Sequence, residues 1–166
     1  MTKCLFYTVV LSVLIFSGCS KYNVHFSSHQ KGWDQVPKIL ARIHEPQFPS
    51  MDFNLTDFGG VGDSTTDNKL AFDKAIKKCN ESGGGRVIVP NGVWLVNGPI
   101  HLKSNVHLVL KNGAIIRFNE EPKYFLPVVL SKWEGTELFN YSPFIYAYQA
   151  TNVAISGKGI VDGDSK

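Results

Sequence analysis

Cys19 is the residue whose neighbours most clearly predict chemistry, because its thiol lies in a pattern typical of acylation. It directly follows Phe16-Ser17-Gly18, and the apolar run Leu5–Phe16 and Lys3 come before it. An apolar run followed by two small residues and a cysteine is typical of the site at which bacterial lipoproteins are cleaved and acylated. The run is too short to span a membrane, which takes roughly 20 residues. We therefore predict a lipoprotein signal peptide at residues 1–18 and a lipid on Cys19. A plain secretory signal is the alternative.

The other cysteines, the glycine-rich stretch and the histidines lie in patterns that give little support for a functional site. Cys4 belongs to the predicted leader and Cys19 to the lipid site, so Cys79 is left without a disulfide partner and is expected to be a small core residue. The glycine-rich stretch Phe58–Asp63 has neither the Lys-Ser/Thr pair of a phosphate loop nor the GxGxxG spacing. Three histidines precede it without a supporting cysteine or carboxylate cluster, so no metal site is predicted: His25, His29 and His44.

The overall charge excludes a strongly basic binding surface. The 166 residues carry a formal net charge of +3, or 3 − 1 = +2 once Lys3 leaves with the leader. This small charge is spread evenly, so we expect no nucleic-acid partner. The length suits one domain with a sizeable core.

The elements that must position any site begin after a proline-containing tether. Residues 19–51 are predicted to be this tether and surface wrap, with a helical turn near 36–43. Alternation predicts a strand at 52–57. Thr66 or Asp67 is then expected to cap a helix that runs to about Cys79 and ends at Gly83-Gly84-Gly85. Its predicted apolar stripe is Leu70, Phe72, Ala75, Ile76 and Cys79.

Short apolar strands follow the helix, and no second helix is expected. The predicted strands are 86–90, 93–96, 99–102, 106–110 and 114–118, with Asn-Gly pairs at 91–92, 97–98 and 112–113. Such pairs suit hairpins or the corners of a β-solenoid. The segment Asn105-Val106-His107-Leu108 is echoed by Asn152-Val153-Ala154-Ile155, an offset of 152 − 105 = 47 residues. We interpret this offset as two coils of roughly 23 residues, with asparagine ladders at the turns and the helix covering the first coil.

The segment between the two echoes is rich in aromatic residues and is interrupted by Pro122, Pro127 and Pro143. We expect it to form loops. Its aromatic side chains could stack on sugar rings or pack the loops onto the solenoid, and the sequence leaves both open. They are Tyr124, Phe125, Trp133, Phe139, Tyr141, Phe144, Tyr146 and Tyr148.

From about Phe53 to Asp164 the chain resembles the N-terminal part of glycoside hydrolase family 28, the polygalacturonases. The resemblance rests on FGGVGDSTTDNKLAFDKAIKKC, on GPIHLKSNVHLVL, on SPFIYAY and GKGIVDG, and on the Trp133-Glu134-Gly135 step. It implies an all-β fold, a right-handed parallel β-helix capped by one amphipathic helix, over residues 52–166. It also implies inverting hydrolysis of α-galacturonosyl linkages in pectin, without a metal or other cofactor.

The residues that perform this chemistry in the family have no counterpart here. Asn-Thr-Asp, Asp-Asp, Gly-His-Gly and Arg-Ile-Lys motifs are missing from the sequence. The pair Asp162 and Asp164 matches an early coil turn of the family, so no catalytic residue is predicted in this chain, and no substrate-binding residue is assigned. We expect the chain to be an inactive N-terminal fragment of a pectin-degrading lipoprotein of the bacterial cell envelope. The alternatives are a polysaccharide-binding or adhesin β-helix, and a related rhamnogalacturonan hydrolase or lyase.

Overall fold

The computed structural model describes residues 32–164, so the predicted signal peptide and Cys19 lie outside the described residues. The chain divides into two units, Met1–His44 and Glu45–Lys166, each described by itself. The described part of the first unit contains a 3-10 turn, η2 (Gly32–Gln35), and a short helix, α2 (Val36–Leu40). This helix corresponds to the helical turn predicted near 36–43, and none of its side chains is buried.

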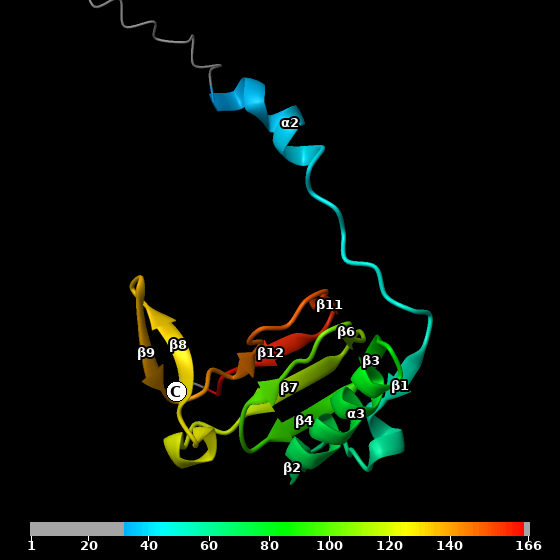
Figure 1. Ribbon diagram of the computed structural model, residues 1–166. Helices are drawn as coiled ribbons and strands as arrows, with labels where there is room; N and C mark the ends of the chain where they lie inside the picture. The colour runs from blue at the N-terminus through cyan, green and yellow to red at the C-terminus, as the bar shows by residue number, and fades with distance from the viewer. Residues whose placement is uncertain (1–31, 165–166) are drawn as a thin grey trace, which may run out of the picture. The chain divides into compact units, whose positions relative to one another are not determined.

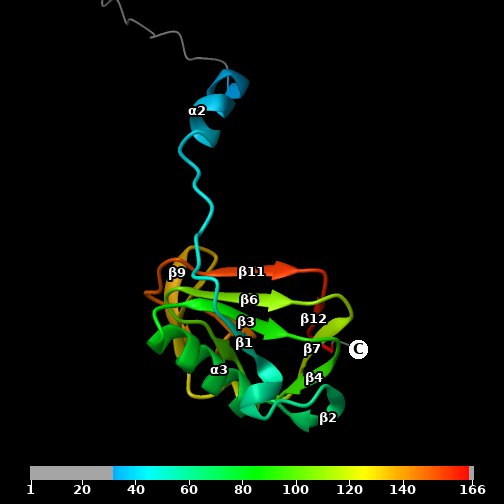
Figure 2. The ribbon, with the colours of Figure 1, turned by 90° about the vertical axis from the view of Figure 1, so that its right-hand side faces the viewer.

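The second unit is a parallel β-helix whose coils stack strand on strand (Figures 1 and 2). One sheet has the order β1 (Asp52–Asn54), β3 (Gly85–Val89), β6 (Val106–Leu110), β11 (Ala154–Gly157). The second has the order β2 (Asp63–Asp67), β4 (Gly92–Val96), β7 (Ala114–Phe118), β12 (Ile160–Asp162). The third pairs β5 (Ile100–His101) with β10 (Ile145–Tyr146). Pairing in all three is parallel, which confirms the predicted right-handed β-helix and makes the Asn-Gly pairs corners of coils.

Alternating side chains place the core between the sheets. In β6 the buried residues are Val106, Leu108 and Leu110, and in β7 they are Ala114, Ile116 and Phe118. Because successive strand residues point to opposite faces, each strand contributes every second side chain to the interior. The five strands predicted between 86 and 118 are confirmed to within about two residues. The predicted strand at 52–57 is shorter, because Leu55–Phe58 forms a 3-10 turn, η3.

The register shows that the internal echo is one coil and not two. Gly85 pairs with Val106, so an ordinary coil spans 106 − 85 = 21 residues. Ala154 pairs directly with His107, so the next coil spans 154 − 107 = 47 residues. The interpretation of two coils of roughly 23 residues was therefore wrong, because the extra length is an insertion within a single coil. The predicted asparagine ladder is present: Asn152 Nδ2 donates to Asn105 Oδ1 at 3.1 Å.

Helix α3 (Lys69–Glu81) lies at the β1 end of the stack, opposite β11, and packs against η3, β1, β3 and β5, as predicted for a helix that covers the first coil (Figure 2). Its buried residues are Ala71, Phe72, Ala75, Ile76 and Cys79. Leu70 was wrongly assigned to this stripe: its side chain is 63% exposed, because two residues of helix rotate it about 200° away from Phe72. At the C-terminal end Gly84 N–H donates to the Cys79 carbonyl at 2.9 Å, as expected for the glycine stop.

The helix begins one or two residues later than predicted, because Thr66 and Asp67 belong to β2. The residue at the junction is Asn68, whose side chain is buried and fully hydrogen-bonded. Its Oδ1 accepts from Val61 N–H at 2.8 Å, and its Nδ2 donates to the carbonyls of Val61, Thr66 and Leu95. One amide therefore joins the glycine-rich turn, the helix start and β4.

Replacing Asn68 with leucine should destabilise the unit by about 3 kcal/mol or more, because a buried N–H and three carbonyls lose their partner. Asn80→Leu is the matched control, since Asn80 makes a single bond, to the Ser104 carbonyl at 2.9 Å, and should cost about 1 kcal/mol. Urea denaturation measures both. Equal losses would show that the Asn68 network adds nothing beyond one bond.

Gly157→Ala should also be costly, because the added Cβ would lie 1.9 Å from the Leu110 carbonyl oxygen and the backbone φ is +120°. We expect a loss of about 3 kcal/mol or more in the free energy of unfolding. Gly59 has φ +86° with nothing near an added Cβ, so Gly59→Ala isolates the backbone strain at about 1–2 kcal/mol. If both variants unfold at the same urea concentration, the close approach of the coils at Gly157 is not a constraint.

Candidate functional site

The candidate site is built by residues 119–148, which leave the coil after β7 and return to it at β10. They form a 3-10 turn, η4 (Pro122–Phe125), and an antiparallel hairpin of β8 (Val129–Trp133) and β9 (Thr136–Asn140). Loops alone were predicted here, so the hairpin was missed. Its signal is the two-residue turn Glu134-Gly135, where φ is +47° and +89°, as a tight hairpin turn with the twist of its strands requires.

The aromatic residues of this segment divide into two groups. Phe144 stacks on the core residue Phe118, with ring centroids 4.8 Å apart and an angle of 12° between the planes, and Phe125 is buried beside it. These rings pack the insertion onto the coil. The second group is exposed and available for contact with a ligand: Trp133, Phe139, Tyr141 and Tyr148.

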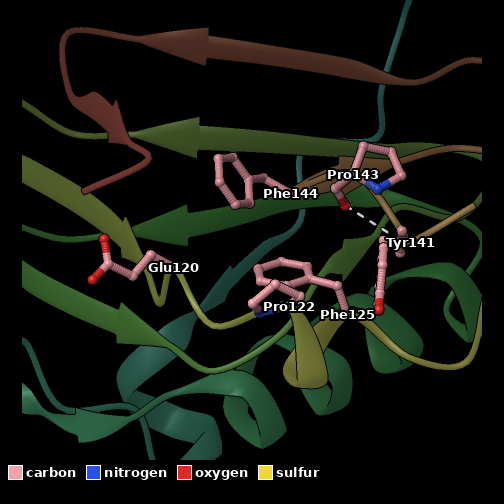
Figure 3. Close-up of a pocket in the computed structure, with 7 residues that line it drawn as sticks. Glu120, Pro122, Phe125, Tyr141, Pro143 and Phe144 are labelled. Carbon is pink, nitrogen blue, oxygen red and sulfur yellow. Dashed lines mark hydrogen bonds between the residues drawn. The ribbon is translucent and has the colours of Figure 1, made fainter. Parts of the chain in front are cut away.

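A pocket of about 380 Å³ lies beside the packed rings and is drawn in Figure 3. Pro122, Phe125, Pro143 and Phe144 make most of its lining apolar, and Tyr141 and Glu120 lie at its edge. The lining has no cationic side chain to receive the carboxylate of an acidic sugar. With a mainly apolar lining and no cation, this pocket suits an apolar group better than a uronate.

Two histidines bridge neighbouring coils and resemble a base–nucleophile pair in distance alone. His101 Nε2 lies 3.0 Å from Ser142 Oγ, and His107 Nε2 lies 2.7 Å from Ser156 Oγ. Burial lowers the pKa of both imidazoles, with nearby Lys69 adding to the effect at His101. Ser142 is buried and its Oγ also donates to the Pro143 carbonyl, at 3.3 Å. Because the same His–Ser contact occurs at two places along the coils, we interpret it as a structural link between coils and not as a catalytic pair.

Asp162 and Asp164 lie together but do not form an acid–base pair. Arg117 Nε is 3.2 Å from Asp162 Oδ2 and 4.0 Å from Asp164 Oδ1. The Asp164 backbone N–H and then Arg117 lower the pKa of Asp162. A glycosidase general acid needs a raised pKa so that it holds its proton. Asp162 therefore stays ionised, in agreement with leaving this pair out of the catalytic prediction.

The glycine-rich turn and Cys79, which the sequence also singled out, are occupied or buried. Val61 N–H of the glycine-rich turn is bonded to Asn68, and the Asp63 carboxylate accepts from Thr65 and Thr66 N–H, which lowers the Asp63 pKa. Burial raises the pKa of the Cys79 thiol to about 11, so it stays protonated in the core.

Residues 32–164 contain no cluster of His, Cys, Asp and Glu that could hold a metal ion. Within the same range no helix has the length and apolarity for a membrane span.

Comparison with known proteins finds relatives among enzymes that act on polygalacturonate. Residues 53–115 match the family described as rhamnogalacturonase A/epimerase, pectate lyase-like. A probable polygalacturonase of Vitis vinifera is 32% identical over 119 residues, which cover 66% of this chain and 24% of that protein. The solved exopolygalacturonase of Thermotoga maritima has a TM-score of 0.76 and 48% identity, over 80% of this chain and 29% of its own. For the family 28 exopolygalacturonase of Yersinia enterocolitica the TM-score is 0.59 at 28% identity, over 70% and 21%.

The N-terminal stretch is also shared with proteins of other activities. Plasmin and fibronectin-binding protein A of Streptococcus pneumoniae is 37% identical over 79 residues, which are 47% of this chain and 11% of that protein. The chain spans about a quarter or less of the length of the curated relatives it matches. The likeness to the polygalacturonases covers more of the chain. A curated relative, two solved structures and a matching family thus confirm that the chain is related to the polygalacturonases of glycoside hydrolase family 28.

Proposed function

We propose that this chain is the N-terminal scaffold of an inverting glycoside hydrolase that cleaves α-galacturonosyl linkages in pectin. The observation that carries the proposal is the likeness to the Thermotoga maritima exopolygalacturonase, at 48% identity over 80% of the chain. An inverting hydrolase needs an acid and a base whose carboxyl groups lie roughly 6.5–9.5 Å apart, one of them with a raised pKa. Asp162 and Asp164 do not form such a pair, and the family's Asn-Thr-Asp and Asp-Asp motifs are missing from the sequence, so the catalytic residues would lie in sequence beyond these coils.

The last described coil supports the proposal that this chain is a scaffold and that the catalytic residues lie elsewhere. Ile155 and Val161 align with Leu108 and Ile116, which are buried inside the β-helix. Ile155 and Val161 themselves are 47% and 45% exposed. Apolar side chains at inward positions are normally covered by the next coil of a solenoid. A further coil on β11 and β12 would bury them and would continue the fold toward a catalytic region.

A non-catalytic adhesin is the second candidate, favoured by the match to plasmin and fibronectin-binding protein A. That match covers 47% of the chain, against 66% for the probable polygalacturonase. A hydrolase requires catalytic carboxylates in the rest of the natural reading frame, whereas a binding protein does not. The two candidates therefore differ in a measurable activity.

The first functional prediction concerns catalysis. Protein expressed from the complete natural reading frame should release reducing ends from polygalacturonate, with inversion at the anomeric carbon visible by proton NMR. The 166-residue chain alone should release none, since it lacks the carboxylate pair. Rhamnogalacturonan and alginate serve as comparison substrates. Activity of the isolated chain, or a full-length protein inactive on polygalacturonate, would contradict the proposal.

We also propose that Cys19 is acylated and holds the protein on a membrane of the bacterial cell envelope. The pattern Phe16-Ser17-Gly18-Cys19 after an apolar run supports this. Cys19→Ser should move the protein from the membrane fraction to the soluble fraction and abolish labelling by a radioactive fatty acid. Cys79→Ser, which removes the buried thiol, should leave both unchanged. A Cys19→Ser protein that still sediments with membranes would overturn the anchor.

A further inference from the structure

The outward side of the third sheet carries polar and aromatic residues. His101 of β5 lies beside Tyr146 of β10, in direct register and with ring centroids 5.1 Å apart. The chain continues past the strands, and the Tyr146 and Tyr148 rings stack with centroids 6.2 Å apart and an angle of 5° between their planes. Tyr148 is 51% exposed, so much of its ring is open to solvent.

Two hollows meet at Tyr148, and we name them together the tyrosine groove. The first has a volume of about 250 Å³ and is lined by Lys132 and Glu137 of the hairpin with Tyr146 and Tyr148. The second has a volume of about 310 Å³ and is lined by Asn80, Lys103 and Gln149 with Tyr148. The second hollow falls within the roughly 300–1,000 Å³ of ligand sites in proteins, and the first is slightly smaller. Tyr148 therefore lines both hollows, of which the second is mainly polar and the first presents both polar and apolar surface.

The chemistry of the groove matches an acidic sugar. Lys132 lines one hollow and Lys103 the other, and a carboxylate is the complementary partner of a lysine side chain. Glu137 lies directly opposite Lys132 across the hairpin, and a carboxylate there accepts hydrogen bonds from sugar hydroxyls. The exposed Tyr148 ring offers a flat apolar surface for the C–H face of a pyranose. The apolar pocket of Figure 3 offers no cation.

The walls of the groove are fixed before any ligand arrives. The Tyr146 hydroxyl donates to the Leu130 carbonyl at 2.7 Å and joins β10 to the hairpin strand β8. Asn80 Nδ2 donates to the Ser104 carbonyl at 2.9 Å and joins α3 to the turn that carries Lys103. Since both walls are held by hydrogen bonds, little conformational freedom is lost when a ligand binds.

We propose that the tyrosine groove binds two consecutive galacturonate units, with Lys103 and Lys132 each pairing with a carboxylate and Tyr148 stacking on a sugar ring. The identity of the sugar rests on the proposed function, whereas the groove rests on the geometry above.

The test is titration of the purified, isotope-labelled 166-residue chain with trigalacturonate, followed by NMR. Amide shifts should gather at 102–104, 130–132 and 146–150. The double variant Lys103→Gln/Lys132→Gln should bind about tenfold or more weakly, and the neutral methyl ester of trigalacturonate should lose a similar factor. Lys111→Gln is the matched control, since it removes an exposed charge that lines neither hollow.

A second variant separates stacking from folding. Tyr148→Phe keeps the ring and should retain binding, whereas Tyr148→Ala should weaken it while the strand amides keep their chemical shifts. Absence of binding, equal binding by the double-lysine variant and the control, or shifts elsewhere would overturn the groove. These outcomes leave the hydrolase proposal standing, because that proposal is judged from the products of the full-length protein. An inactive full-length protein whose isolated chain still binds would overturn the hydrolase and keep the groove.

Discussion

In-register parallel stacking is the constraint on which the rest of this structure depends. Each coil must return its strands to the positions of the previous coil, so that Val87 lies over Leu108 and Trp94 over Ile116. The interior then fills with stacked apolar side chains, and the corners meet at backbone distance. Gly157 is needed because its α-carbon faces the Leu110 carbonyl oxygen, and Asn152 can bond to Asn105 because their corners superimpose. Any additional chain must leave and re-enter at a corner.

The sequence predicts the parts of the fold in which packing and local conformation agree. The strands from β3 to β7 are short apolar runs separated by turns that contain asparagine or glycine, so their bounds could be predicted closely. The strand β2 could not, since all five of its residues are polar and exposed and its pairing with β4 is visible only in space. Leu70 was misassigned because an apolar residue at a helix start was counted without its angular position. The echo was misread because an offset of 47 residues does not distinguish two coils from one coil with an insertion.

The candidate site was less predictable, because aromatic composition does not separate packing from recognition. Phe144 and Tyr148 occur in the same short segment, yet one stacks on Phe118 in the core and the other lines two hollows. These two roles can be told apart only from the positions that the hairpin and β10 take in the folded chain. The carboxylates were easier to judge, because the Arg117 contact and lowered pKa agree with leaving Asp162 out. The buried core thus resides mainly in the coils, whereas Lys132 and Glu137 of the proposed groove belong to an excursion from them.

The placement of that excursion has an evolutionary consequence. Residues 119–144 lie between β7 and β10, while the register of β11 on β6 and of β12 on β7 is preserved. Mutation can therefore lengthen, shorten or replace the hairpin without altering the strands that bury the core. Proteins with this scaffold can change their ligand preference by changing the insertion at one corner, because selection for folding and selection for ligand preference act on different residues. Diversity among such proteins should accordingly be concentrated at corners, and their strands should change slowly.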